Sequence, residues 1–138
     1  MPEEVVHARG HEHVAATHSS TLELTSDDTL TPAGDCILGI EADRVPADFD
    51  DAFVAACRDA DATIELVLAV DGHEATITGG GHPALGFESD RSLVCRTSDY
   101  VDDRTVMVGA DGAAADLDRE LVAALADGAR FEAILRVG

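Results

Sequence analysis

An Asp71-Gly72 dipeptide joins two runs in which apolar and polar residues alternate, Thr63 to Val70 and His73 to Thr78. Alternation with a period of two is typical of a half-buried strand, and Asp-Gly favours the tight turn of a β-hairpin. Alternating or short apolar runs recur along the chain and predict further strands at 4–9, 20–25, 36–40, 92–97, 105–108 and 130–137. We therefore expect about eight strands.

Two segments have helical spacing instead. The first, 49–60, follows Asp48 or Asp50 as an N-cap and places Phe53, Val54 and Cys57 on one face. The second, 113–126, carries apolar residues at helical spacing, and Gly128 stands where a left-handed C-terminal cap is expected.

These elements predict a mainly β fold at the border of the α+β class. We expect a single domain over 1–138, built as a β-sandwich or jelly-roll-like fold of about eight strands with two short helices. We find no tandem repeat in the sequence.

The charged residues predict an environment. The chain has 28 Asp and Glu against nine basic residues, all of them arginine, for a formal charge of −19. At molar salt the screening length falls to about 3 Å, so such a surface ceases to repel itself. We expect a cytoplasmic protein from an organism with high internal salt, and the charge disfavours bulk nucleic-acid binding.

Several classes of protein are disfavoured by what the sequence lacks. No apolar run follows a basic stretch near the start, and no run approaches the roughly 20 residues of a membrane span, so we expect neither a signal peptide nor a membrane partner. The cysteines, Cys36, Cys57 and Cys95, form no CxxC motif and are expected to be buried thiols.

Two windows of this acidic chain lack acids. Residues 5–22 hold four histidines and one acid, and residues 75–87 hold His82, a Gly79-Gly80-Gly81 run and no acid. Imidazole is a ligand for divalent transition metals, so His11, His18 and His82 are candidate metal ligands. The alternative is that these histidines cap turns, and that the glycines form a flexible turn rather than a ligand cradle.

Charged residues at strand ends form a second set of candidates. Arginine there needs a partner, and Asp99 and Asp103 are the expected partners of the arginines nearby. The set predicts either an anion-binding cluster or a structural ion-pair network. The candidate ligand-binding residues are Arg9, Asp35, Arg96, Asp99, Asp103 and Arg104.

Seven segments follow one another along the chain: Arg9-Gly10-His11, Ala16-Thr17-His18, Thr21 to Thr25, Leu30 to Ile40, Gly81-His82-Pro83, Ser98 to Thr105 and Ala115 to Val122. Together they resemble the archaeal domain of unknown function 371, and with the acidic composition they indicate a haloarchaeal member. The resemblance implies a mostly β, sandwich-type single domain and no activity, because the family is uncharacterised. The chain has Gly10-His11-Glu12 where the family is expected to have Gly-His-Pro. Gly-His still recurs in both acid-poor windows, which favours two neighbouring loops.

The sequence thus predicts a small-ligand or metal-binding β-sandwich domain and leaves open whether it is an enzyme. The alternative is a non-enzymatic interaction or oligomerisation module, in which the acid-poor patches dock a second copy or another protein. RNA or nucleotide binding through Arg9, Arg96 and Arg104 ranks last, because only specific contacts would survive high salt.

Overall fold

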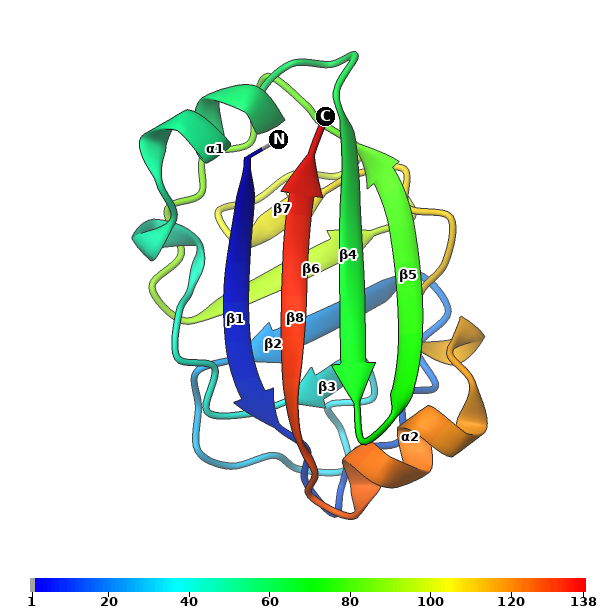
Figure 1. Ribbon diagram of the computed structural model, residues 1–138. Coiled ribbons are helices and arrows are strands. Elements are labelled where there is room, and N and C mark those ends of the chain that lie inside the picture. Colours follow the sequence, from blue (N-terminus) through cyan, green and yellow to red (C-terminus); the bar gives the residue numbers. More distant parts are fainter. Residues whose placement is uncertain (1) are drawn as a thin grey trace.

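The structure, a computed structural model, describes residues 2–138 and consists of two four-stranded sheets packed face to face (Figure 1). Sheet A is antiparallel, with strand order β1 (Glu3–Arg9), β8 (Arg130–Val137), β4 (Thr63–Val70) and β5 (His73–Gly80). Sheet B has the order β3 (Ile37–Gly39), β2 (Thr21–Thr25), β6 (Ser92–Arg96) and β7 (Thr105–Met107). Its central pair is antiparallel and its two outer pairs are parallel. The predicted mainly β, two-sheet fold is confirmed.

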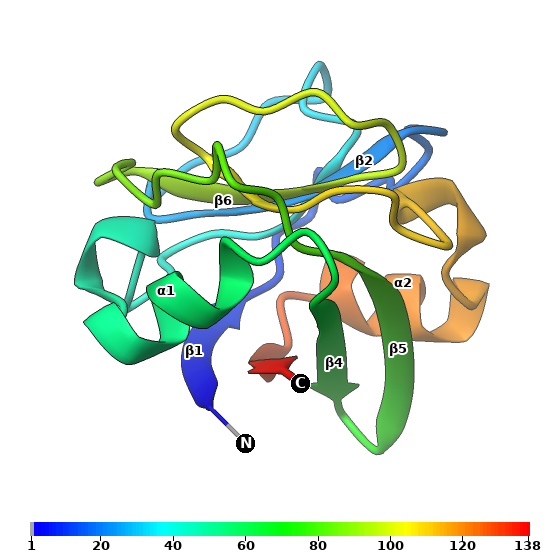
Figure 2. The same ribbon diagram turned by 90° about the horizontal axis from the view of Figure 1, so that it is seen from above.

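Helices α1 (Asp51–Cys57) and α2 (Arg119–Ala126) lie at opposite sides of the space between the sheets (Figure 2). Each follows a short 3₁₀ turn, Pro46–Asp48 or Ala114–Asp116. The helix predicted over 113–126 is therefore interrupted. Leu117 is buried in an extended conformation, and the Asp118 side chain accepts the N–H of Glu120 to begin α2. No helix in the described part of the chain is long and apolar enough to cross a membrane.

The strands alternate as the sequence predicts. In β8, the side chains of Phe131, Ala133, Leu135 and Val137 face the core. Those of Arg130, Glu132 and Arg136 face outward. The β4–β5 hairpin turns at Asp71 (φ 48°) and Gly72 (φ 82°), which confirms the Asp-Gly prediction. Gly128 (φ 84°) caps α2 as expected. The outer face of sheet A is thereby left polar at both ends of its strands.

The two halves of the chain repeat the same order of elements, although no tandem repeat is found along the sequence. Each half of the chain forms one long strand, two short strands, a 3₁₀ turn, a helix and a second long strand. When β1 to β4 are renamed β5 to β8 and the reverse, the strand order of each sheet becomes its own order read backwards. An approximate two-fold axis therefore passes between β8 and β4 in sheet A, and between β2 and β6 in sheet B.

The hydrogen bonds at the two sheet edges match across this axis. The N–H of His7 donates to Oδ1 of Asp43 (2.8 Å), and the N–H of Thr78 donates to Oδ1 of Asp111 (2.9 Å). The reverse backbone bonds also match, from Asp43 to the carbonyl of His7 and from Asp111 to that of Thr78. Left-handed backbone recurs at the equivalent pairs Ala16 and Phe87, and Glu41 and Gly109. The two halves thus share geometry as well as strand order.

The repeat is also visible in the sequence once the halves are aligned. Residues 42–60 and 110–128 are identical at nine of nineteen positions, most of them in the turn and helix. The strands have diverged, because alternating apolar side chains interchange with little cost. A search for period-2 patterns therefore finds the strands but not their duplication.

A circular permutant tests this organisation. Pro2 accepts the N–H of Val137 at 3.1 Å, so the two ends of the described chain are neighbours (Figure 1). We expect a chain opened between Asp71 and Gly72, with Gly138 joined to Met1 by a short glycine linker, to keep the fold. Opening the chain between Val94 and Cys95, inside the central pair of sheet B, is the control and is expected to prevent folding. Circular dichroism melting curves distinguish the two. Failure of the hairpin permutant to fold would contradict the repeat as a structural unit.

Candidate functional site

His11 and His82 lie at equivalent positions of the two halves. Each follows an edge strand of sheet A, β1 or β5, and these strands run antiparallel, so the two Gly-His turns stand at diagonally opposite corners (Figure 1). The Nδ1 of His11 accepts the N–H of His13 (3.0 Å), and that of His82 accepts the N–H of Ala84 (2.9 Å). The expectation that the two loops are neighbours is wrong, because the duplication separates them.

His18 caps the start of β2. Its Nδ1 accepts the N–H groups of Ser20 (3.2 Å) and Thr21 (3.1 Å), just as the Oγ of Ser89 accepts those of Arg91 and Ser92 before β6. The serine at the equivalent place makes the same pair of contacts through its hydroxyl oxygen. No group of three or more His, Cys, Asp or Glu side chains within residues 2–138 is arranged to hold a metal ion.

The glycines of the two Gly-His turns let the chain pack closely against the helix ends. A Cβ on Gly10 would collide with the carbonyl of Leu125 in α2, and one on Gly81 with the carbonyl oxygens of Cys57 and Asp59 after α1. Arginines fasten the same two loops, because Arg119 donates to the carbonyl of Ala16 (3.1 Å) and Arg58 to that of Leu85 (2.7 Å). Of the triple glycine, Gly79 and Gly80 end β5 and Gly81 packs against the end of α1, so the run is not a flexible turn.

Arg96 and Arg104 share a carboxylate that differs from the expected ones. Asp102 accepts from the guanidinium of Arg96 (2.9 Å) and from that of Arg104 (3.2 Å), whereas Asp99 and Asp103 are exposed. Thr105, fully buried, accepts Nε–H of Arg96 at 2.8 Å and donates to Asp102 at 3.0 Å. The geometry is that of a structural ion-pair network, in which Nε and Nη2 of Arg96 both donate to protein acceptors.

The remaining candidates of this set contribute backbone atoms. The carbonyl of Asp35 accepts the N–H groups of Thr17 and His18, and the carbonyl of Asp103 accepts that of Ser89. Tyr100 is 60% exposed and lies with its ring 4.8 Å from the Arg96 guanidinium carbon. These residues hold the loops that cross the outer face of sheet B.

The Asp102 network predicts a pH dependence of stability. Burial alone would raise the pKa of the Asp102 carboxyl, but hydrogen bonds from Thr105 and Arg104 and the charge of Arg96 lower that pKa to about 2. Because the folded value lies below the ordinary value of about 3.9, the stabilisation is complete above pH 4 and is lost as pH falls through about 2. We expect Asp102→Asn to cost about 2 kcal/mol at pH 7 and little near pH 2. Urea unfolding measures both, with exposed Asp103→Asn as the control. An equal loss at the two pH values would contradict the ion-pair account.

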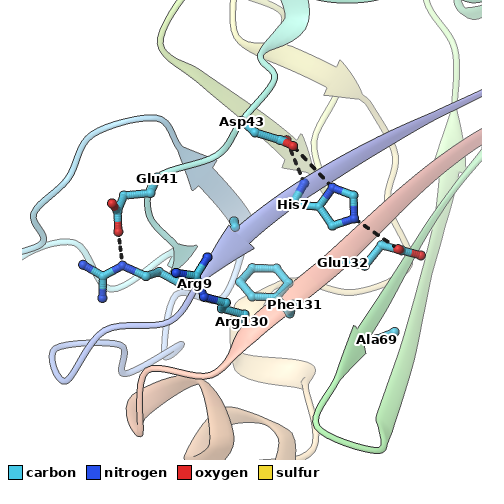
Figure 3. Close-up of a pocket in the computed structure, with 9 residues that line it drawn as sticks. His7, Arg9, Glu41, Asp43, Ala69, Arg130, Phe131 and Glu132 are labelled. Carbon is cyan, nitrogen blue, oxygen red and sulfur yellow. Dashed lines mark hydrogen bonds and ion pairs between the residues drawn. The ribbon is translucent and has the colours of Figure 1, made fainter.

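A pocket of about 610 Å³ lies at the end of β1 and β8 on the outer side of sheet A (Figure 3). Arg9 and Arg130 are partners in the β1–β8 register, so their side chains leave adjacent strands on the same face of sheet A, and the Arg9 guanidinium extends toward Glu41. The other lining residues come from β1, β8, β4 and the segment after β3: His7, Ala8, Glu41, Asp43, Ala69, Phe131 and Glu132. We call this the Arg9–Arg130 pocket.

The two arginines of this pocket differ in their contacts. Arg9 forms an ion pair with Glu41, whereas the exposed side chain of Arg130 has no hydrogen bond or ion pair with any other residue from 2 to 138. Most other arginines, such as Arg44, Arg91 and Arg136, are paired with carboxylates. A guanidinium without an acceptor is conspicuous in a chain with about three acids for each base.

His7 stands between two carboxylates at the other side of the pocket. Its Nδ1 lies 3.3 Å from Oδ2 of Asp43, and its Nε2 lies 3.3 Å from Oε2 of Glu132 (Figure 3). Arg9 is the one pocket residue among the predicted candidates. Arg130, His7 and their acidic neighbours were missed, because the β1–β8 pairing joins residues more than 120 positions apart and leaves no local signal.

The cysteines are not arranged as nucleophiles. Burial raises the pKa of the Cys36 thiol to about 11, and burial raises those of Cys57 and Cys95 to about 12. Thiols with such values stay protonated at neutral pH, and the thiolate is the reactive form. Cys57 and Cys95 are buried as expected, whereas Cys36 is only partly buried.

Comparison with known proteins places the chain in a family. Residues 6–138 match the family described as a domain of unknown function, DUF371. An archaeal relative, the uncharacterized protein MJ0206 of Methanocaldococcus jannaschii, is 41% identical over 124 residues, which cover 90% of this chain and 91% of that protein. The fold expected from the resemblance is present, and the match extends over both halves of the repeat. The chain therefore belongs to the DUF371 family.

Proposed function

We propose that the protein binds a small molecule with an anionic group, such as a phosphate or a carboxylate, in the Arg9–Arg130 pocket. The observation that carries the proposal is the difference between the two ends of sheet A. Across the approximate two-fold axis, Arg9 corresponds to Gly80 and Arg130 to Thr63, and no arginine stands at either equivalent position. Shared features of the halves serve the fold, so an arginine pair that stands at one end of sheet A and not at the equivalent end needs another explanation.

The chemistry of the pocket supports this proposal. Guanidinium groups bind phosphate and carboxylate through paired N–H donors, and adjacent arginines bring more than one such fork to the same anion. A volume of about 610 Å³ lies in the range of small-molecule sites. An anionic ligand would also interact favourably with the charge of Arg130 and with part of that of Arg9. The acids around the pocket do not pair with Arg130 themselves.

Arg130→Gln is expected to weaken binding of inorganic phosphate and of pentanoate at least about tenfold, since one charge-assisted contact is worth about 1.5 to 3 kcal/mol. Isothermal titration in molar potassium chloride measures the affinities. Arg136→Gln is the matched control, because Arg136 projects from the same strand and face but is paired with Glu3 (3.1 Å) and Glu65 (3.6 Å). Equal losses in the two variants, or no binding by the wild type, would overturn the proposal.

Metal binding by His11, His18 and His82 stays a prediction. Each Nδ1 already accepts backbone hydrogen bonds, which leaves Nε2 as the free ring nitrogen at each position. Elemental analysis of protein purified without chelator or histidine tag tests it. Stoichiometric zinc, nickel, copper or iron would support a metal site, and a metal-free protein whose melting is unchanged by EDTA would exclude one.

We further propose that the protein works in the cytoplasm of a haloarchaeon. The support is the composition, with 28 acids, nine arginines and no lysine. Thermophilic proteins with many ion pairs are typically rich in lysine as well as glutamate, so heat adaptation does not account for this surface.

The outer face of sheet A favours a second candidate function, self-association as an interaction module. Val5, Ile134 and Val67 form an in-register apolar row across three strands, and no helix crosses this face (Figure 1). A second copy of this chain would bring an identical apolar row to this face, so the two rows could pack against each other. Light scattering in molar salt tests this candidate. A dimer that Ile134→Glu converts into a folded monomer would support it, and a wild-type monomer at all concentrations would exclude it.

A further inference from the structure

The Arg9–Arg130 pocket has two ends of opposite charge. In the strand register, Arg9 stands beside Arg130, and two residues back along β1 His7 stands beside Glu132. Side chains two residues apart on one face of a strand lie about 7 Å from each other. The arginine pair therefore forms one end, and the carboxylates of Asp43 and Glu132 around His7 form the other (Figure 3).

The carboxylates at one end of the pocket can accept a further hydrogen bond. Asp43 and Glu132 each face one ring nitrogen of His7 at 3.3 Å. A carboxylate has about four acceptor positions, and the ring offers each carboxylate at most one N–H, so each can accept a further donor. Glu132 has no other hydrogen bond or ion pair from its side chain within residues 2–138, whereas Asp43 also accepts the N–H of His7. An ammonium group of a ligand placed beside Glu132 would supply a further donor.

The sum of the charges points in the same direction. Arg9 and Arg130 share the pocket with three carboxylates, those of Glu41, Asp43 and Glu132, so a ligand meets a pocket that is not positive as a whole. A simple anion gains at the arginine end and is repelled by the other end. A molecule that carries both charges gains at both.

Building on the proposed function, we infer that the ligand class is a zwitterion, a molecule whose anionic group and ammonium group are separated by about 7 Å. The anionic group lies against Arg9 and Arg130, and the ammonium group lies against Glu132 and Asp43. ω-Amino acids with a chain of four to six carbons have this separation and serve as probes.

Isothermal titration with 5-aminopentanoate, pentanoate and pentylamine tests the inference in molar potassium chloride. We expect 5-aminopentanoate to bind at least about tenfold more tightly than either of the other two. Glu132→Gln is expected to abolish this preference, because the variant loses the ammonium contact and binds pentanoate more tightly. Glu65→Gln, the equivalent substitution in the other half, is the control and is expected to keep the preference.

The outcomes separate this inference from the proposed function. Equal affinity for 5-aminopentanoate and pentanoate would overturn the zwitterion and leave the anion site standing. Tightest binding of pentylamine would also overturn it, since the pocket would then be a cation site. Absence of binding for inorganic phosphate and for all three probes would overturn the proposed function itself.

Discussion

Gly81→Ala is expected to lower the free energy of unfolding by about 3 kcal/mol, which for a domain of this size corresponds to a fall in melting temperature of about 10 °C. The added Cβ would enter the space of the Cys57 and Asp59 carbonyl oxygens at the end of α1, which are backbone atoms that no side-chain rotation can move aside. The N–H groups of Gly81 and His82 also donate there, to the carbonyls of Ala62 and Cys57. Moving β5 away from α1 would therefore break two hydrogen bonds as well.

The neighbouring glycine provides the matched control for this prediction. A Cβ on Gly80 would lie 3.8 Å from the carbonyl of Ala62 and 3.9 Å from that of Val108, which is ordinary contact. Gly80→Ala is therefore expected to change the unfolding free energy by less than about 1 kcal/mol. Urea unfolding of the two variants measures the difference. Similar losses in both would show that the turn requires glycine for its backbone conformation rather than for its contact with α1.

Lowering potassium chloride from about 1 M to about 0.1 M is expected to lower the melting temperature by about 10 °C. The screening length rises from about 3 Å to about 10 Å over this range, so the repulsion among 28 acids reaches across the surface. A series of thermal melts followed by circular dichroism measures the effect. A protein that melts no earlier in low salt would contradict the proposed haloarchaeal environment.

A charge-reduced variant separates charge repulsion from general effects of salt. Glu12, Asp28, Glu74 and Asp99 are exposed and carry no side-chain hydrogen bond to another described residue. Converting all four to their amides lowers the formal charge from −19 to −15 and is expected to flatten the salt dependence. An unchanged slope would indicate that salt acts on burial of apolar surface rather than on repulsion.

The fold was predictable where the signal is local. Alternation located β4 and β5, and Asp71-Gly72 identified their hairpin, because both depend on residues that are adjacent in the sequence. The break at Leu117 was not predictable from spacing, since an apolar residue at a helical position fits a buried extended one equally well. The repeat was missed because only its turn and helix segments retain identity.

The candidate site was predictable only in part, for the same reason. Arg9 was identified from its place at the end of a strand, but its neighbour Arg130 depends on a pairing between the first and last strands. Asp102 took the role expected of Asp99 and Asp103 because Thr105 and the Arg104 N–H fix its carboxylate beside both arginines. Recognition of the repeat is what brings out the arginine pair, because the β1–β8 pair contains it and the equivalent β5–β4 pair does not.

The most direct test of the anion site follows the arginine side chains themselves. The nine arginines give nine Nε–H resonances with no lysine signals to obscure the cationic groups, so heteronuclear NMR can monitor every base in the protein. On titration with inorganic phosphate in molar potassium chloride, the resonances of Arg9 and Arg130 are expected to shift and saturate while those of the other seven stay in place. Shifts centred on Arg96 and Arg104, or no saturating shift at any arginine, would contradict the assignment of the site to the Arg9–Arg130 pocket.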